Sequence, residues 1–280
     1  MSNILKAFIN IVNNYQVGIK EVTNGNNRAN NMGEGLENYI KNAFADNFKE
    51  NDIAKQKSNI RNTFSYIGTK NNPPDIILKK GDAIEVKKVE TIGTLQFNSS
   101  HPKAKLKSNN SKIKIECKRC GDGNWIEKDI LYSIGHIPKE TNKLKSLWFV
   151  YGTCYAADEN VYQNIENKIK AELNNIDGFD ANTNELGRVN NIDSLDITYL
   201  RIRGMWVIKH PAKVFNDLDK EKEKQFNLIA IIPLNKYNNF PKNDKDEIEK
   251  NTLIKVQDEI ISDPNNAAKE MHIKLLLFKS

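Results

Sequence analysis

The sequence predicts an α/β (α+β) fold in which a mixed central sheet is flanked by helices. Two observations lead to this prediction. Segments near the N-terminus carry apolar residues three and four positions apart, as amphipathic helices do. Later segments are short, β-branched and aromatic, and helical patterns recur between them. No clear linker interrupts the chain, so residues 1–280 are predicted to form a single domain.

Four segments have the apolar spacing of helices. The first, 4–15, reads ILKAFINIVNNY, and the second, 31–48, places its apolar residues on one face. Residues 159–173 return to the helical pattern after the first predicted strands. Residues 246–261, DEIEKNTLIKVQDEII, are predicted to be helical as well. We therefore expect helices both before and after the sheet.

The predicted strands begin with a hairpin. Residues 76–79 and 83–89 are joined by KKGD, and its Gly-Asp pair suits a tight turn. Residues 146–155, SLWFVYGTCY, form a continuous β-branched and aromatic run, which is typical of a buried central strand. The remaining predicted strands are 197–208, 226–233 and 273–278.

The composition indicates a soluble globular protein, with 39% hydrophobic and 28% charged residues. No apolar run approaches the length of a membrane span, and the N-terminus lacks the pattern of a secretory signal. Three cysteines are too few for a disulfide framework. We therefore expect a cytoplasmic protein with no membrane partner.

The positive charge of the chain is concentrated in one segment. Residues 79–146 hold fifteen Lys or Arg against eight Asp or Glu, an excess that covers the whole net charge of +6. A concentrated basic stretch suits a polyanion such as DNA or RNA. A solvated lysine-rich surface is the alternative, and charge alone does not separate the two.

The predicted hairpin brings acidic and basic side chains together. Strand alternation places Glu85 and Lys87 on one face, whereas Ile84 and Val86 point into the core. Asp75 begins the partner strand and can lie beside Glu85. Two carboxylates at a strand end favour a hard divalent cation, usually magnesium, and a nearby lysine can orient a water or offset charge on a phosphate. This arrangement predicts phosphodiester hydrolysis.

The same residues resemble the PD-(D/E)XK nucleases. Pro74-Asp75 is followed by nine residues and then by Glu85-Val86-Lys87. The resemblance implies that fold, with Mg²⁺ held by Asp75 and Glu85 and with Mn²⁺ as a possible substitute. Lysine is common in this chain, so the bare pattern also arises by chance, but here its two halves fall on adjacent predicted strands.

The helix upstream extends this resemblance. Gly33, Leu36 and Glu37 match the Gly-x-x-Leu-Glu context in which this superfamily places a first-helix glutamate near the metal. The resemblance implies that Glu37 is a further catalytic and metal-binding residue. Glu34, one turn earlier, is the substitute candidate, and an ordinary solvated helix acid is the competing interpretation.

Three later segments resemble the NgoPII-type group of type II restriction endonucleases. They are 89–107, 117–135 and 199–211. The resemblance implies a homodimer that cleaves double-stranded DNA at a short palindrome, with GGCC favoured, and leaves 5′-phosphate ends. A companion DNA methyltransferase is expected in the same restriction-modification system. The lysine-rich insert at 108–114 and the GDG at 121–123 depart from the pattern and put the exact specificity in doubt.

Two polar segments are candidates for DNA contact. The first supplies Asn98, Ser99, Ser100, His101, Lys103 and Lys105. Short hydrogen-bonding side chains next to positive charge contact phosphates and base edges, although a mobile loop has the same composition. In the second, Arg201 and Arg203 share a strand face and can fork onto guanine O6 and N7, unless they are exposed structural arginines.

The pair Cys117 and Cys120 has the spacing of a zinc knuckle. A structural zinc needs four ligands, and the other candidates, Cys154, His101 and His136, do not form a second paired motif. We therefore expect two reduced cysteines at a strand end and no structural zinc.

Other functions fit parts of the same pattern. One is a PD-(D/E)XK repair or junction-resolving nuclease that recognises DNA structure. Another is a non-catalytic DNA- or RNA-binding protein in which the acid pair is accidental. A basic globular protein with no nucleic-acid role is the fourth possibility, and it predicts no salt-dependent DNA binding.

Overall fold

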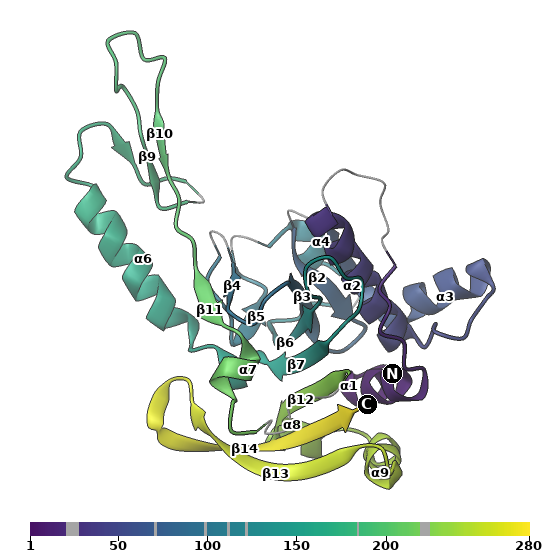
Figure 1. Cartoon of the computed structure of the whole chain (residues 1–280). Coiled ribbons are helices and arrows are strands. Elements are labelled where there is room, and N and C mark those ends of the chain that lie inside the picture. The colour runs from purple at the N-terminus through teal and green to yellow at the C-terminus, as the bar shows by residue number, and fades with distance from the viewer. Residues whose placement is uncertain are drawn as a thin grey trace.

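The computed structural model describes residues 1–20, 28–69, 72–97, 100–110, 113–120, 123–183, 185–218 and 225–280. Within them the largest sheet has nine strands, in the order β1-β2-β3-β6-β7-β12-β14-β13, with β5 paired to β6 beside this path. Parallel pairs (β3 with β6, β7 with β12) occur among antiparallel ones. The predicted mixed sheet is confirmed (Figure 1).

The strands of this sheet are β1 (Phe64–Thr69), β2 (Asn72–Leu78), β3 (Ala83–Val89), β5 (Lys105–Lys107), β6 (Glu127–His136), β7 (Ser146–Tyr151), β12 (Asn227–Pro233), β13 (Lys255–Asp263) and β14 (Asn266–Lys279). Two smaller sheets pair β11 (Val207–Lys209) with β4 (Thr94–Gln96), and β9 (Gly187–Val189) with both β8 (Phe179–Asp180) and β10 (Leu200–Ile202). The helices are α1 (Ile4–Asn13), α2 (Arg28–Ala45), α3 (Ile53–Thr63), α4 (Ile115–Lys118), α5 (Gly152–Tyr155), α6 (Glu159–Leu173), α7 (Pro211–Val214), α8 (Leu234–Asn238) and α9 (Lys242–Lys250).

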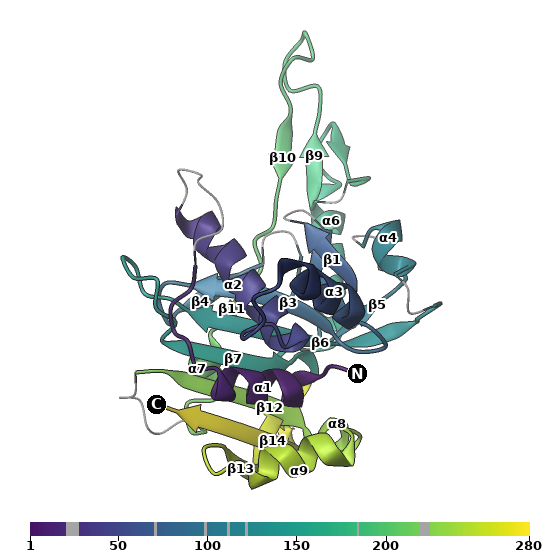
Figure 2. The same cartoon turned by 90° about the vertical axis from the view of Figure 1, so that its right-hand side faces the viewer.

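The core lies around the central strands. Every residue of β7 and of β12 is buried, which suits their near-continuous apolar sequences and their parallel pairing. Helices α1, α2 and α3 lie on one side of the molecule, toward the viewer in Figure 2. In Figure 1 α6 and the β9–β10 pair stand away from this body, and the β9–β10 pair also projects from it in Figure 2.

Two glycines allow close packing next to the cleft described below. A Cβ on Gly135 of β6 would lie 2.6 Å from a methyl group of Leu36, so its absence lets α2 rest on the sheet. A Cβ on Gly152 would lie 2.4 Å from the carbonyl oxygen of Ala104. Gly152 therefore lets the segment that carries Lys103 approach the end of β7.

Most predicted elements are confirmed, and three predictions are wrong in part. The predicted strand 146–155 ends at Tyr151 and continues as the short helix α5. The predicted strand 197–208 is divided into β10 and β11. The predicted helix 246–261 ends at Lys250, and β13 follows because its backbone pairs with β14.

No helix among the described residues has the length and apolarity to cross a membrane. The single-domain assignment of 1–280 stays a prediction.

Candidate active site

The hairpin of β2 and β3 brings the predicted catalytic residues together. Its register pairs Ile76 with Ile84 and Ile77 with Ala83. Asp75, one residue before this pairing, accepts a hydrogen bond of 2.7 Å at Oδ2 from the backbone N–H of Val86. The carboxylate from β2 is therefore fixed next to the part of β3 that carries Glu85 and Lys87.

These three side chains line one cleft with a volume of about 610 Å³. Its wall also contains residues from the end of β4 and the 97–110 segment, from β6 and from the residues that follow β10. They include Gln96, Phe97, Ser100, His101, Lys103, Asn110, Tyr132, Arg203, Gly204 and Met205. The cleft therefore combines acids, bases and aromatic rings around the end of the hairpin.

Lys87 is held in this cleft by an ion pair with Glu85. Its Nζ donates to Glu85 Oε1 at 2.6 Å and lies 5.4 Å from the centre of the Phe97 ring. Burial alone would lower the pKa of Lys87, but the charges of Glu85 and Asp75 and the hydrogen bond to Glu85 outweigh it and raise the pKa. The side chain is thus an ammonium that has protons available for a second acceptor.

Asp75 has an unusual affinity for its proton. Burial, and next the neighbouring charge of Glu85, raise its pKa to about 8, although Lys87 and the Val86 hydrogen bond oppose the shift. A carboxyl group that resists ionisation beside another carboxylate becomes charged readily when a cation sits between them. The donor set of Asp75 and Glu85 therefore fits a hard divalent cation.

Glu37 lies near this pair but does not line the cleft. It is half-buried on α2, and burial raises its pKa, with smaller effects from Lys41, which lowers it, and from Glu34 and Glu85, which raise it. Among the described residues, no group of three or more His, Cys, Asp and Glu side chains is arranged to hold a metal ion. Glu37 is thus close enough to influence the acid pair electrostatically without forming a third ligand in this arrangement.

The polar segment after the hairpin reaches the cleft in part. Ser100, His101 and Lys103 line it, whereas Asn98 and Ser99 lie outside the described residues. His101 is buried, its ring stacks on Tyr162 with centroids 4.9 Å apart, and burial lowers its pKa. The backbone N–H of Lys103 donates to the Tyr132 hydroxyl at 2.7 Å. These contacts fix the segment against β6 and α6.

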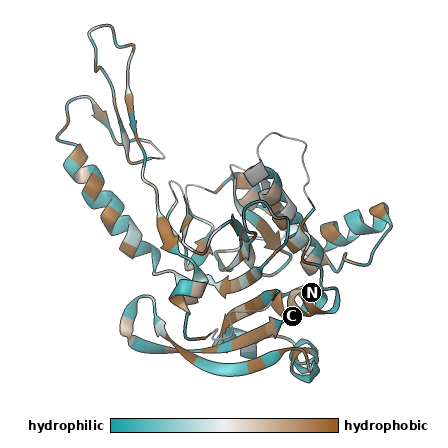
Figure 3. Cartoon of the chain, viewed as in Figure 1, coloured by the Kyte–Doolittle hydropathy of each residue, from teal (hydrophilic) through white to brown (hydrophobic). Residues whose placement is uncertain are grey.

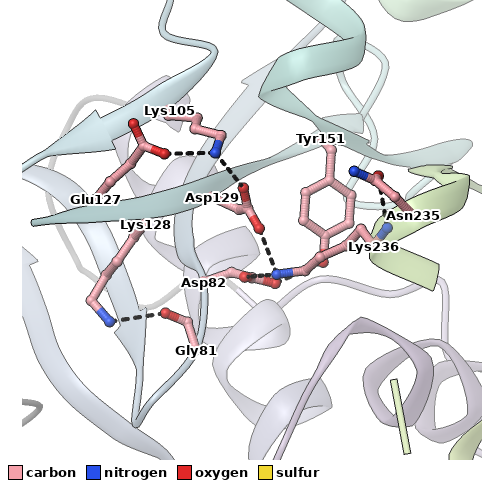
Figure 4. A network of polar contacts seen from close by, with 9 residues as sticks. All are labelled: Gly81, Asp82, Lys105, Glu127, Lys128, Asp129, Tyr151, Asn235 and Lys236. Atoms are coloured by element: carbon pink, nitrogen blue, oxygen red, sulfur yellow. Dashed lines mark hydrogen bonds and ion pairs between the residues drawn. The ribbon is translucent and has the colours of Figure 1, made fainter. Parts of the chain in front are cut away.

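Lys105 does not line this cleft and lies in a separate network of charges (Figure 4). Its Nζ contacts Glu127 Oε1 at 2.6 Å and Asp129 Oδ1 at 3.8 Å. Asp129 also accepts from Lys236 at 2.6 Å. Lys105 is therefore engaged by acids away from the hairpin residues, because β5 pairs with β6 at this point and turns the side chain toward them.

The same network anchors the turn of the hairpin. Asp82, the residue before β3, accepts from the Tyr151 hydroxyl and from Lys236 Nζ, each at 2.6 Å. Asp82 is buried, whereas Lys236 belongs to α8, far along the chain. The start of the strand that carries Glu85 is therefore tied to β7 and α8.

The two arginines share an acid, but they do not share a strand, because β10 ends at Ile202 before Arg203. Arg201 contacts Glu185 Oε1 at 2.7 Å and Arg203 contacts the same oxygen at 2.5 Å. Both arginine side chains remain more than half exposed. Arg203 lines the cleft and Arg201 does not. A DNA base or phosphate would have to compete with Glu185 for them.

The cysteines differ from the prediction in their position. Cys117 lies on the short helix α4 and not at a strand end, and burial raises its pKa to about 12. Cys120 follows this helix and is also buried. Cys154 is buried elsewhere, with its thiol directed at Met271 Sδ at 3.8 Å.

Sequence reasoning missed the contribution of β6 to the site. Tyr132 lines the cleft, pairs in register with Glu85 and packs edge-on against Phe97. The sequence DILYSIG contains the continuous apolar run of a buried strand, a signal that would have identified β6.

Two comparisons of the sequence with known proteins found a match. Residues 2–262 match the model of the NgoPII restriction endonuclease family. The type II restriction enzyme NgoPII of Neisseria gonorrhoeae is 44% identical over 279 residues, which cover 99% of each chain. No solved structure matches the chain.

Proposed function

The chain belongs to the NgoPII restriction endonuclease family, and from this membership we propose how its cleft cleaves DNA. The chain is a type II restriction endonuclease, a site-specific deoxyribonuclease of a restriction-modification system. The observation that supports the proposed mechanism is the convergence of Asp75, Glu85 and Lys87 on one cleft.

We propose that Asp75 and Glu85 hold Mg²⁺, and that Mn²⁺ can replace it. The bound cation would polarise the scissile phosphate and activate the attacking water. Asp75 releases its proton to become a ligand, and the Val86 N–H keeps its carboxylate oriented. Glu37 supports the pair from α2 through its charge. We also propose that the chain forms a single domain, that this domain has the PD-(D/E)XK fold, and that the cleft lies within it.

Lys87 supplies the positive charge on the protein side of the reaction. One N–H of its ammonium group donates a hydrogen bond to Glu85. The other N–H groups can donate to a phosphate oxygen or a water in the cleft. An ammonium in a half-buried site stabilises the charge that grows on the phosphate as the P–O bond breaks. The products would carry 5′-phosphate and 3′-hydroxyl ends.

DNA would reach the cleft over the 97–110 segment and the residues that follow β10. Ser100, His101, Lys103 and Arg203 support this proposal because they line the cleft. Arg201 can join them if DNA releases it from Glu185. Asn98 and Ser99 remain predicted contacts, and Lys105 is the weakest candidate because acids already surround it.

The proposed target is a short palindrome, with GGCC favoured through the family resemblance. Cleavage of both strands at a palindrome needs two sites related by a twofold axis, so we propose a homodimer. A companion DNA methyltransferase that protects the same sequence completes the proposed system.

Digestion of plasmid DNA tests this function. With Mg²⁺, a supercoiled plasmid that contains GGCC should give discrete fragments whose sequenced ends locate the cut, whereas EDTA should abolish cleavage. A matched plasmid in which every GGCC is altered is the control for specificity. Preferential cutting of branched DNA would instead indicate a junction-resolving nuclease. Binding that survives EDTA without any cleavage under added metal would indicate a non-catalytic binding protein.

A further inference from the structure

The segment 159–207 is an arm that exposes apolar side chains. It contains α6 and the β8–β9–β10 sheet. Helix α6 stands away from the body in Figure 1, and β9 and β10 project from it in Figures 1 and 2. Brown patches mark both parts in Figure 3 although neither rests on the core. Helix α6 has no buried residue, and its apolar side chains Val161, Ile165 and Ile169 are 50%, 48% and 39% exposed at four-residue spacing.

Exposure is greatest at the tip of the arm, between β9 and β10. Leu195 is 77% exposed and Ile197 is 75% exposed, with Ile192 beside them at 51%. Exposed apolar groups in a contiguous patch mark a surface that binds another macromolecule. Single exposed residues need no such explanation, but here the apolar side chains of one tip occur together.

The tip is held in shape by its own hydrogen bonds. Asp193 Oδ1 accepts from the backbone N–H groups of Leu195 at 3.0 Å and Ile197 at 3.2 Å, and its Oδ2 accepts from Thr198 at 2.8 Å. Asp196 accepts from the backbone of Asn191 at 3.1 Å. These bonds satisfy the loop internally, so the outward apolar side chains are presented on a preorganised scaffold, which lowers the entropic cost of binding.

The charge of the tip argues against DNA as the partner of the tip, although the base of the arm carries Arg201 and Arg203 next to the cleft. Residues 159–207 contain eight of the 36 Asp and Glu residues but only five of the 42 Lys and Arg residues. The tip itself, 189–200, has two aspartates and no Lys or Arg. A polyanion would be repelled by this tip, whereas the basic segment 79–146 of the same chain has an excess of seven positive charges that complements it.

We infer that the tip of the arm docks on the body of a second copy of this chain. Charge complementarity between the acidic arm and the basic remainder identifies the partner, and the apolar side chains Ile192, Leu195 and Ile197 supply the desolvated centre of the contact. The arrangement is reciprocal, because in a twofold pair each copy gives its arm to the other.

The arm also connects this contact with the cleft. Trp206, at its base, packs edge-on against Tyr162 at 5.4 Å, and its carbonyl oxygen accepts from the Phe97 N–H at 2.8 Å. The next residues toward the tip, Arg203 to Met205, line the cleft itself. Docking of the arm would therefore hold one wall of the cleft in place. The inference rests on the proposed function only in requiring two copies of the chain at one DNA site.

The mass of the protein in solution tests this inference. Light scattering or sedimentation equilibrium on the full chain should show a dimer, free or on a DNA duplex, whose dissociation constant rises with salt. The double variant Leu195→Ser/Ile197→Ser should raise that constant at least about tenfold, as loss of a central apolar contact does. Leu253→Ser is the matched control, since Leu253 is 62% exposed outside the arm.

Thermal melting of the double variant shows whether the monomer is still folded. Leu195 and Ile197 contribute nothing to the core, so the double variant should melt like the wild type apart from the stability that dimerisation adds. A wild type that stays monomeric both free and on DNA, or a double variant that dimerises as strongly as the wild type, would overturn the inference. Mass is measured without cleavage, so failure of the nuclease mechanism would be seen separately as uncut plasmid.

Plasmid cleavage gives a second readout. The double variant should convert supercoiled plasmid to nicked circles before linear DNA, because a weakened pair cuts one strand at a time. Equal rates of linear product from the double variant and from Leu253→Ser would contradict a role for the tip in pairing.

Discussion

The Asp75 carboxylate accepts a 2.7 Å hydrogen bond from the backbone N–H of Val86, the residue between Glu85 and Lys87. This bond crosses from one strand of the hairpin to the other. It holds Asp75 of β2 beside the part of β3 that carries Glu85 and Lys87. The side chains of Glu85 and Lys87 project from one side of β3, and that of Val86 projects from the other. The position of Asp75 therefore depends on a bond between its own side chain and the backbone of β3, and Asp75→Ala would remove that bond.

Replacement of Asp75 by alanine should abolish cleavage and spare DNA binding. The variant loses one of two proposed metal ligands, and several kcal/mol of transition-state stabilisation correspond to a rate loss of about a thousandfold or more. Single-turnover cleavage and a gel-shift assay measure the two effects. Asp246→Ala, on α9 outside the cleft, is the matched control and should cut normally. Substantial cleavage by Asp75→Ala would contradict the proposed site.

Lys87→Met should lower kcat by roughly a hundredfold to a thousandfold, since it removes a charge that stabilises the transition state. Its affinity for Mg²⁺ should stay the same or increase, because an ammonium group next to the acid pair repels a cation. Lys87→Arg should recover part of the rate. Titration calorimetry with Mg²⁺ separates binding from catalysis, and Lys269→Met, on β14, serves as the control. An unchanged kcat in Lys87→Met would leave the lysine without a role.

Glu37→Gln should weaken Mg²⁺ binding by about tenfold to a hundredfold, as loss of a supporting group around a metal does. The effect arises because Glu37 contributes negative charge near Glu85 without lining the cleft. The Mg²⁺ dependence of the cleavage rate measures it. Glu34→Gln is the informative comparison, and a larger effect there would transfer the role to Glu34.

Binding of Mg²⁺ should strengthen as the pH rises toward 8 and then level off. The pKa of Asp75 is raised to about 8 in the metal-free protein, so the folded state retains a proton that the cation must displace. Calorimetry in buffers of different ionisation enthalpy should detect proton release below that pH. The release should be absent in Asp75→Asn, and equal release in both proteins would refute the assignment.

The same shift has a consequence for stability. A raised carboxyl pKa means that the folded state binds more protons than the unfolded state between the ordinary pKa and about 8, so this group's contribution to stability is lost as the pH rises through that window. Asp75→Asn should flatten this part of the pH dependence in the metal-free protein, as measured by thermal melting.

Lys236→Met should destabilise the protein by about 2–4 kcal/mol, because it leaves the buried Asp82 without its cation. The value lies at the low end of the effect of breaking a buried pair, since the Lys236 side chain is 23% exposed. Chemical denaturation should show the loss, and the melting temperature should fall by roughly 5–10 °C. Lys242→Met, at 84% exposure, should have little effect. Equal stability of the two variants would show that the network in Figure 4 carries little energy.

The sequence was sufficient for the hairpin and its site because alternation is a local property. Ile84 and Val86 point to the core, and this alone determines that Glu85 and Lys87 share the other face. The position of Asp75 follows from the short turn. Helix α6 was predicted at its observed bounds because its apolar residues recur at helical spacing.

The predictions that failed depended on distant partners. β13 has a single buried residue, so its sequence alone does not distinguish a helix from a strand, and pairing with β14 decides. Helix α3 was missed because its sequence, IAKQKSNIRNT, is mostly polar and has no apolar stripe at helical spacing. Lys103 and Lys105 are two residues apart and have similar surroundings in the sequence, but only Lys103 lines the cleft. Lys105 is directed away from the cleft because β5 pairs with β6, and the sequence does not reveal this pairing.

The order of strands in the sheet places the last strand of the chain beside its core. β14, near the C-terminal end of the chain, pairs with β12, which in turn lies beside β7 next to the hairpin's half of the sheet. A chain that ended before residue 266 would lack β14, so β12 would have one open edge. Such a fragment should be prone to self-association through that edge, so the last strand of the sheet protects the rest of the chain against aggregation.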